Sequence, residues 1–492
     1  MGSSLTCVDL FAGCGGLSLG LKQAGFEVKL AVEKSAMAAE TYYHNFIKPL
    51  NDAEEWRRFH EDCSIEEQAE AGLVVRELSD MLTSQRTISR LRDSEIDLVA
   101  GGPPCQGFSL AGRRNPKDVR NKLPWQFLEF VEKIQPKAVI IENVSGMRHD
   151  FRKHGARSPF EDLRIALSET GPGYEVQPML LNAMHFGVPQ HRPRVFLVGL
   201  RKDRARQHTS GITDDIWDSS LDSPQVAVLG RRPLLAPRRT HFDEKNKESE
   251  HKYLTVEDAI SDLLSDGDNR NGLLSEFARE MREDSRFLKA AVSGRHATSR
   301  CRNHVLRKHS NLVKDRFRLY QFLRDAKIHP TILALPRKTG ISDHARRKMM
   351  HDAVSTVEYP VRSGDGSVLA KDQRALLNLL NKLATKKHSQ RALSWDRPAP
   401  TVVSMPDDFV HPVQPRIPTV RELARFQSFP DAFEFRSKET TGAHRRRTEV
   451  PQYTQVGNAV PPRLAFALGC HLREFLVQVR EKENNTSESV VA

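Results

Sequence analysis

Residues 96–110 read IDLVAGGPPCQGFSL, and this stretch decides the fold that we expect for the chain. The apolar run at its start is short enough to be a buried parallel strand. Gly101 and Gly102 then end the strand, and two prolines stiffen the turn that brings Cys105 to its carboxyl end. Open α/β sheets bind their ligands at that edge, so Cys105 is a candidate nucleophile. Taken alone, a cysteine among apolar residues is more often an inert buried side chain.

The chain opens with a strand, a glycine turn and a helix. Residues 5–11 (LTCVDLF) predict a buried strand, residues 12–16 (AGCGG) a tight turn, and residues 17–24 a helix. This order is typical of the first half of a nucleotide-binding βαβ unit, because glycines let the backbone approach a ligand. The next strand ends in Glu33, which either accepts hydrogen bonds from ribose hydroxyls or is a surface carboxylate. Asp62 either closes a third strand, within reach of an adenine, or lies in a solvated loop.

A carboxylate and two arginines mark the later strands. Glu142 ends the apolar run AVII, and a carboxylate buried there without a partner would be costly, which favours a working role. Gln190, Arg192 and Arg194 alternate on the approach to the strand VFLVGL, so they share one face of an extended segment. An amide and two guanidinium groups on one face suit a phosphate or a base edge, and a salt-bridged strand edge is the alternative.

The composition favours a polyanionic partner, nucleic acid above all. The 492 residues carry a formal net charge of +12, although a charged and merely soluble protein is the alternative. The six cysteines form no C-x-x-C pair and have no histidines at metal-ligand spacing, so we expect a reducing compartment, no disulfides and no metal. No apolar run approaches the ~18 residues of a membrane span, and no signal-peptide pattern opens the chain.

Alternation of strands and helices stops after about residue 203, and the chain becomes rich in Arg, Lys, His and Ser. Further on, Thr419 with Glu422 three residues later marks the start of a capped helix whose apolar side faces inward. We therefore predict a sheet domain, a second, smaller basic domain, a return segment with a C-terminal helix, and a disordered tail, at residues 1–203, 204–440, 441–482 and 483–492.

Six motifs occur in an order that resembles DNA (cytosine-5) methyltransferases of the bacterial and phage modification type. They are DLFAGCGGLSLGL (9–21), PPCQGFS (103–109), ENV (142–144), QHRPR (190–194), RELARFQSFP (421–430) and YTQVGNAVPP (453–462). The matching parts span residues 6–200 and 419–469, and the basic middle is unmatched, as the variable target-recognition region of that family would be.

This resemblance implies an α/β fold, a Rossmann-like methyltransferase sheet that binds S-adenosylmethionine and releases S-adenosylhomocysteine. The glycine loop would hold the methionine part of the cofactor, Glu33 its ribose, and Asp62 would lie near the adenine. The full set of implied cofactor-binding residues is Phe11, Ala12, Gly13, Gly15, Gly16, Leu17, Glu33, Asp62, Pro103, Leu123, Asn458 and Ala459.

The resemblance also assigns catalytic roles. The Cys105 thiolate would add to carbon 6 of a cytosine that has flipped out of the duplex, so that carbon 5 can attack the sulfonium methyl group. Glu142 would hydrogen-bond N3 and the exocyclic amine, and Arg192 and Arg194, with Gln190 beside them, would hold the base and its phosphate.

The expected function is therefore methylation of a specific duplex DNA sequence in a restriction-modification or related defence system. We expect a monomer in the bacterial cytoplasm or nucleoid, with a cognate restriction endonuclease or defence complex as a partner that does not associate stably. Two alternatives remain open, an RNA (tRNA) cytosine-5 methyltransferase and a catalytically silent DNA-binding relative. The large basic middle favours DNA, and intact Cys105 and Glu142 count against a silent relative.

Overall fold

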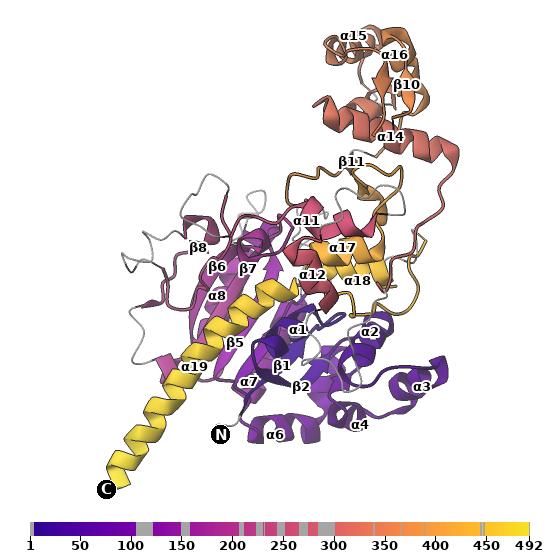
Figure 1. The fold of residues 1–492 in the computed structure, drawn as a ribbon. Helices are drawn as coiled ribbons and strands as arrows, with labels where there is room; N and C mark the ends of the chain where they lie inside the picture. Colours follow the sequence, from indigo (N-terminus) through magenta and orange to yellow (C-terminus); the bar gives the residue numbers. More distant parts are fainter. Residues whose placement is uncertain are drawn as a thin grey trace.

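The computed structural model contains a sheet covered by helices, a second half of helices and loops (the described residues between 251 and 458), and a long C-terminal helix that extends beyond the sheet (Figure 1). It describes residues 4–104, 122–148, 158–205, 211–222, 230, 232–243, 251–264, 274–283, 301–337, 340–364, 366–387, 389–442, 445 and 448–491, with side chains to 480.

Within the described residues, the central sheet has eight strands in the order β3-β2-β1-β4-β5-β7-β6-β8. Strands β1 to β5 are parallel, and β7 runs antiparallel to β5 and β6. The strand order reverses between β1 and β4, and open α/β sheets bind ligands at the carboxyl ends beside such a point. The predicted α/β fold class is confirmed. The strands are β1 Leu5–Leu10, β2 Phe26–Val32, β3 Leu73–Val74, β4 Leu98–Gly101, β5 Ala138–Val144, β6 Tyr174–Asn182, β7 Pro193–Arg201 and β8 Trp217–Asp218.

Helices cover both faces of the sheet because the central strands are apolar on both sides. Val8 and Leu10 of β1 pack on one face against α5–α8, whereas Leu5 and Cys7 pack on the other against α1 and α19. The helices of this half are α1 Gly16–Gln23, α2 Ala36–Phe46, α3 Ala53–Arg57, α4 Ile65–Glu70, α5 Leu78–Thr83, α6 Gln85–Asp93, α7 Leu123–Ile134, α8 Pro159–Glu169, α9 Lys202–Ala205 and α19 Pro462–Val491, with a π-helical turn η1 (Arg58–Asp62) and 3-10 turns η3 (Ser145–Arg148), η5 (Ala183–Phe186) and η7 (Ser219–Leu221).

The last helix, α19, lies directly on α1, and a glycine permits the close approach. A Cβ atom added to Gly20 would lie 2.4 Å from the Cβ of Ala465 and 2.4 Å from the carbonyl oxygen of Pro462. Neither atom is the far end of a flexible side chain, so an added methyl group would push the two helices apart.

The substitution Gly20→Ala is therefore expected to lower the free energy of unfolding by about 1–3 kcal/mol, although alanine favours helix. Urea unfolding should show a lower midpoint with an unchanged slope. Gly442→Ala is the matched control, because nothing lies within 4 Å of the Cβ that it would add. Equal midpoints for the two variants would contradict the close contact.

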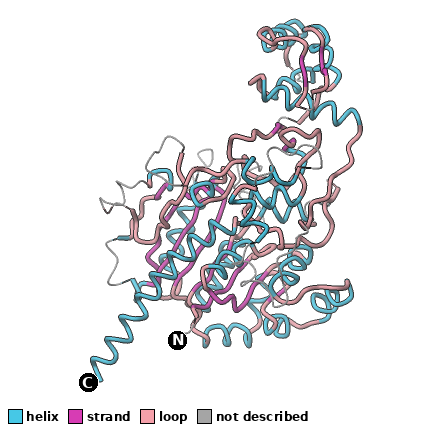
Figure 2. The backbone as a smooth tube through the Cα atoms, in the orientation of Figure 1, coloured by secondary structure: helices cyan, strands magenta, loops and turns pink. Residues whose placement is uncertain are grey.

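The second half is built mainly from helices and loops, as Figure 2 shows, with two short paired-strand sheets, β9–β10 and β11–β12. The predicted cap at Thr419 is present: its side chain accepts from the Glu422 N–H, and the Glu422 carboxylate accepts from the Thr419 N–H. The elements are α11 Val256–Ile260, η8 Ser261–Leu263, α12 Glu276–Glu283, α14 Asn311–Asp325, η9 Pro330–Arg337, α15 Asp343–Ala353, β9 Val361–Arg362, β10 Val368–Ala370, α16 Gln373–Lys382, β11 Arg391–Ala392, η10 Pro406–Asp408, β12 Phe409–Val410, α17 Val420–Phe426 and α18 Gln452–Asn458.

Two predicted boundaries differ from the structure. The sheet domain continues past residue 203, because β8 pairs with Met179 and Leu180 of β6 and because Leu235 packs in the core beside α19. A strand of two residues leaves no periodic pattern in the sequence. The predicted tail at 483–492 is also wrong up to Val491, since α19 continues to that residue, and no proline or glycine interrupts the helix after Gly469.

Candidate active site

The glycine loop after β1 is folded tightly against the end of β2. Phe11, Gly13 and Gly15 have positive φ angles of 58°, 56° and 95°, which suit glycine at the last two positions. The Ala12 N–H donates to the Val32 carbonyl at 3.0 Å, and the Gly15 N–H donates to the Ala12 carbonyl at 2.9 Å. A Cβ on Gly15 would lie 2.4 Å from the Phe46 ring, whereas a Cβ on Gly13 would meet nothing within 4 Å. The loop is therefore packed on one side and open at Gly13.

Glu33 fixes this loop to the loop after β2. Its carboxylate accepts from the Gly13 N–H at 2.9 Å and from the Ser35 N–H at 2.7 Å. Burial raises the pKa of the Glu33 carboxyl, and the two N–H groups oppose that rise. Each carboxylate oxygen keeps a further lone pair, so Glu33 can still accept from the hydroxyls of a ligand.

Asp62 lies in a turn beside the end of β3, because the Arg76 guanidinium donates to the carbonyls of His60 and Cys63. It ends the turn η1, its side chain is exposed, and its carboxylate is 3.3 Å from the Arg57 guanidinium. The third strand is instead Leu73–Val74, where the Glu33 N–H donates to the Val74 carbonyl at 3.1 Å. Asp62 therefore closes no strand, because the insertion after β2 is helical and delays the third strand, and its place near the adenine stays a prediction. Glu77, which the sequence analysis missed, follows that strand and lies 3.3 Å from Lys34.

The turn after β4 is docked on the end of β5. A Cβ on Gly102 would lie 3.0 Å from the Glu142 carboxylate, and the Asn143 side-chain amide donates to the buried Pro103 carbonyl at 2.9 Å. Cys105 lies just beyond, outside the described residues. The motifs PPC and ENV, about 40 residues apart in the sequence, thus meet at one edge of the sheet.

Glu142 is paired with Arg194 across neighbouring antiparallel strands. The Arg194 Nε is 3.0 Å from the Glu142 carboxylate, and the two side chains are only 11% and 13% exposed. Burial raises the pKa of the Glu142 carboxyl, and the positive charges of Arg194 and Arg192 oppose the rise. The site therefore holds a carboxyl group whose pKa burial raises and two arginines lower, and of the two only Arg194 forms an ion pair with it.

Gln190 and Arg192 do not join this pair. The Arg192 guanidinium donates to the carbonyls of Val402, Gly457 and Ala459 at 2.9–3.0 Å, and the side chain is 1% exposed. The Gln190 side-chain amide donates to the Phe426 carbonyl and the Gln427 side chain, and its oxygen accepts from the Val402 N–H at 2.8 Å. The three residues therefore do not act on one common face. Arg194 pairs with Glu142, whereas Arg192 and Gln190 bind mainly backbone groups of other segments.

The GNAVPP turn completes the edge. A Cβ on Gly16 would lie 2.3 Å from the Val460 carbonyl oxygen and 3.4 Å from the Ala459 side chain, so this turn lies on the start of α1. Asn458 is exposed at the end of α18, and Leu123 is half-buried at the start of α7. Leu17, the second residue of α1, is buried in the core. The structure thus brings the glycine loop, Glu33 and the PPC turn to the same sheet edge as Glu142 and Arg194.

A second buried carboxylate, Asp9 of β1, was not singled out from the sequence, although a charge inside the apolar run LTCVDLF was a usable signal. Its Oδ2 accepts from the Ser18 hydroxyl at 2.6 Å, and Ser18 is 3.1 Å from the Tyr42 hydroxyl. Its Oδ1 has no hydrogen-bond partner within the described part of the chain. Burial raises the pKa of Asp9 to about 7.

The substitution Asp9→Asn should raise the free energy of unfolding above pH 7 by about 2–4 kcal/mol, because the wild-type protein then holds a buried charge. As the pH falls from 7 toward 4, the folded wild type takes up a proton that the unfolded chain does not. Its stability therefore rises, and the advantage of Asn disappears. Urea unfolding at pH 5 and pH 8 measures this, and a difference that is the same at both pH values would contradict it.

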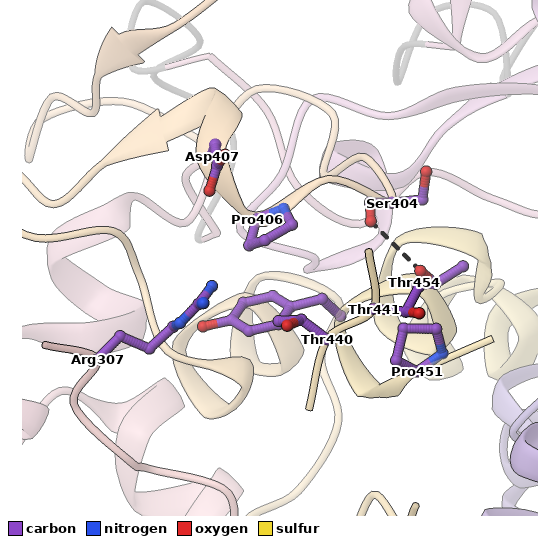
Figure 3. A pocket seen from close by; sticks show the side chains of 9 residues that line it. Arg307, Ser404, Pro406, Asp407, Thr440, Thr441, Pro451 and Thr454 are labelled. Atoms are coloured by element: carbon purple, nitrogen blue, oxygen red, sulfur yellow. Dashed lines mark hydrogen bonds between the residues drawn. The ribbon is translucent and has the colours of Figure 1, made fainter. Parts of the chain in front are cut away.

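The structure also has a cavity of about 160 Å³ between η10 and the start of α18 (Figure 3). Hydroxyl groups of Thr440, Thr441 and Thr454 line it, with Arg307 on one side and Asp407 on another. It is smaller than most cofactor pockets, and it contains none of the predicted site residues. We therefore do not place the reaction there.

Among the residues that the structure describes, no group of His, Cys, Asp and Glu could hold a metal ion. Within the same residues, no helix is both long enough and apolar enough to cross a membrane.

Known proteins resemble the chain over nearly its whole length. The sequence profile of the C-5 cytosine-specific DNA methylases matches residues 5–70 and 76–474. Type II methyltransferase M.DdeI of Desulfomicrobium norvegicum is 31% identical over 94% of this chain and 87% of its own length. Type II methyltransferase M.AgeI of Thalassovita gelatinovora is 30% identical over 94% of this chain and 97% of its own length.

Solved structures agree with the fold. The crystal structure of a putative DNA modification methyltransferase encoded within an E. coli prophage covers 96% of this chain and 99% of that one, with a TM-score of 0.52 and 22% identity. That likeness concerns the architecture, whereas the sequence matches cover both motif-bearing ends and the basic middle. The chain belongs to the C-5 cytosine-specific DNA methylase family.

Proposed function

We propose that this DNA (cytosine-5)-methyltransferase acts on a flipped-out cytosine in a specific duplex sequence, through a covalent adduct with Cys105. The observation that carries the proposal is the buried Glu142 carboxylate, which lies beside the PPC turn and is held by Arg194 at 3.0 Å. A carboxyl group with a raised pKa, in contact with the turn that leads to Cys105 at the carboxyl edge of the sheet, supports such chemistry.

The residues at the sheet edge fit S-adenosylmethionine, which supplies an electrophilic methyl group when bound. The open side of the loop at Gly13 would admit the cofactor, and the Glu33 carboxylate would accept hydrogen bonds from its ribose hydroxyls. Asp62, in the turn η1 beside the end of β3, remains the proposed neighbour of the adenine. The remaining members of the proposed pocket are Phe11, Ala12, Gly15, Gly16, Leu17, Pro103, Leu123, Asn458 and Ala459.

The chain's own groups account for the chemistry on the ring. The Cys105 thiolate forms a bond to carbon 6, and the displaced electron pair makes carbon 5 nucleophilic. Protonated Glu142 donates to N3 as negative charge develops there, and burial of Glu142 favours that protonated form. Arg194 positions the carboxyl group. After carbon 5 is methylated, its proton is lost to water, the electron pair of that C–H bond expels the thiolate, and N3 returns its proton to the Glu142 carboxylate.

Arg192 and Gln190 are positioning residues in this proposal. Their contacts join the strand that carries Arg194 to the segment around Val402 and to the GNAVPP turn. They would therefore hold the two ends of the site together, in place of the base-binding role expected from the motif.

The substrate is a target cytosine in duplex DNA. Flipping a cytosine out of the stack costs a few kcal/mol, which contacts of the basic second half with the duplex would offset. The names of the bacterial relatives, Type II methyltransferases, support a role as the modification enzyme of a restriction-modification system.

The proposal is tested by incubating the purified chain with S-adenosylmethionine and plasmid DNA, followed by bisulfite sequencing. Protection of cytosines in one recurring sequence is expected, and its position defines the recognised site. Transfer RNA incubated in parallel is the discriminating substrate. Methylation of transfer RNA but not of plasmid DNA would replace the proposal by RNA methylation, and methylation of neither would leave a silent DNA-binding relative.

A further inference from the structure

Residues 311–387 form a module that projects away from the sheet (Figure 1). This projecting module comprises α14, η9, α15, the β9–β10 pair and α16. Leu333, Val354 and Leu376 are fully buried within it, so it packs around apolar side chains of its own. Helix α14 contacts β11 at the base of the second half and η9 inside the module, and thereby connects the two.

The projecting module holds most of the net charge of the protein. Its sequence contains sixteen Lys and Arg residues against seven Asp and Glu residues, a net charge of +9 out of +12 for the whole chain. Its 77 residues are about a sixth of the chain. Charge concentrated to this degree produces a positive potential that attracts a polyanion.

Helix α15 displays part of this charge along one side. His344, Arg347, Lys348 and His351 follow the spacing i, i+3, i+4, i+7, and all four are exposed, whereas Met350 is buried. The neighbouring Arg346, which is partly buried, is paired with Asp343 at 2.6 Å. In contrast, Arg347 and Lys348 form no ion pair with any residue that the structure describes.

Helix α16 repeats the arrangement. Arg374, Asn378 and Lys382 are exposed at the spacing i, i+4, i+8, while Leu376 and Leu380 are buried on the other side. Neither Arg374 nor Lys382 is paired with an acidic side chain in the described part of the chain. Unpaired Lys and Arg side chains on two helices are available to bind phosphate groups.

We propose that the projecting module binds the phosphate backbone of duplex DNA that flanks the target site, without reading its sequence. The inference rests on the proposed function, because it assumes that the second half faces DNA. Helix α14 buries three aromatic side chains, Phe317, Tyr320 and Phe322. No fully exposed aromatic ring occurs in the described part of the module. Proteins that hold single strands stack bases on such rings, so the surface suits a duplex better than single-stranded nucleic acid.

The position of the module explains why the contact is with flanking DNA. Helix α14, which belongs to the module, has 15 residues and therefore rises about 22 Å, which corresponds to about six base pairs of B-DNA. A module at least this long, which projects away from the sheet, would contact duplex beyond the target (Figure 1). It adds affinity for long DNA, and it leaves the reacting base and the recognised sequence unchanged.

The test is a fourfold neutralised variant, Arg347→Gln, Lys348→Gln, Arg374→Gln and Lys382→Gln. Its matched control carries Arg58→Gln, Arg86→Gln, Arg90→Gln and Arg92→Gln, four exposed residues of η1 and of α6, and α6 lies far from the module (Figure 1). Each lost phosphate contact should reduce the slope of log K against log salt by about 0.9, so the first variant should lose about 2–4 in slope on a 40-base-pair duplex. On a duplex of about 14 base pairs, too short to reach the module, its affinity and its rate of methyl transfer at saturation should equal those of the wild type.

A gain-of-charge variant distinguishes the effect of charge from an effect of misfolding on DNA binding. Asn378→Lys adds a cation to the same side of α16 and should steepen the salt slope on long DNA by about 0.9. The proposal is overturned if the control variant loses as much slope as the first, if short and long duplexes are affected equally, or if only single-stranded RNA binding changes. Because the slopes are measured by DNA binding alone, they stand even if the wild type methylates no DNA, which would refute the proposed function separately.

Discussion

The Cys105→Ala variant is expected to methylate duplex DNA at least about 10⁴-fold more slowly than the wild type, while it still binds DNA and S-adenosylmethionine. Without the thiolate, carbon 5 of cytosine is not activated, and no other group on the chain is proposed to add to carbon 6. The cofactor pocket proposed at the glycine loop and Glu33 does not include Cys105, so cofactor affinity should be unchanged.

A duplex with 5-fluorocytosine at the target position gives a direct readout of the same step. Fluorine at carbon 5 cannot be removed as a proton, so the wild-type protein should remain covalently bound after methyl transfer. A denaturing gel then shows a protein–DNA band, which Cys105→Ala should not form. Cys63→Ala is the matched control, because Cys63 is a free cysteine in the insertion between β2 and β3. An adduct that forms with Cys105→Ala, or is lost with Cys63→Ala, would rule out Cys105 as the nucleophile.

The parts of the site that the sequence predicted are those in which the decisive signal is local. The first strand, glycine turn and helix follow one another directly, and Glu33 ends the next strand, so their meeting follows from the strand order of a βαβ unit. Glu142 could be identified in the same way, since a carboxylate at the end of a buried strand lacks solvent. Its partner Arg194 was predicted to hold the base and its phosphate together with Arg192, and its ion pair with Glu142 was not predicted.

The errors come from features without a sequence pattern. Strand β3 has two residues, so the helical insertion before it concealed where the third strand lies, and Asp62 was expected to close a strand that begins only at Leu73. Arg192 and Arg194 do alternate, but alternation determines only the face of the strand from which each side chain leaves, and not the group that its guanidinium reaches. The carbonyls that hold Arg192 are supplied by residues 210 and 267 positions later in the chain, which no local pattern reveals.

Helix α17 shows the same limit. The cap at Thr419 and the inward apolar residues were predictable, but the charged side of the helix is buried as well. Arg425 is fully buried because Asp431 accepts from it at 2.7 Å and because Asp262, 163 residues away, also pairs with it. A buried arginine with hydrogen-bonded carboxylates is tolerated, whereas the sequence alone predicts exposure.

The second large effect is expected for Glu142→Gln, which should slow methyl transfer by about 10²–10³-fold, with a smaller change in DNA affinity. Glutamine keeps the shape of the side chain, but it cannot transfer a proton to N3. The formation of the 5-fluorocytosine adduct should slow by the same factor, because Glu142 acts in the step in which the thiolate adds. Glu175→Gln, on β6 of the same sheet, is the control and should remain active.

The pair with Arg194 adds a pH dependence that separates proton donation from simple packing. Arg194 opposes the rise of the Glu142 pKa, so Arg194→Met should raise that pKa further and shift the alkaline fall of the methyl-transfer rate to higher pH. The fall should be absent in Glu142→Gln, whose amide does not titrate in this range. A pH profile of the single-turnover rate that is the same in the wild type, Arg194→Met and Glu142→Gln would show that Glu142 only shapes the site and donates no proton.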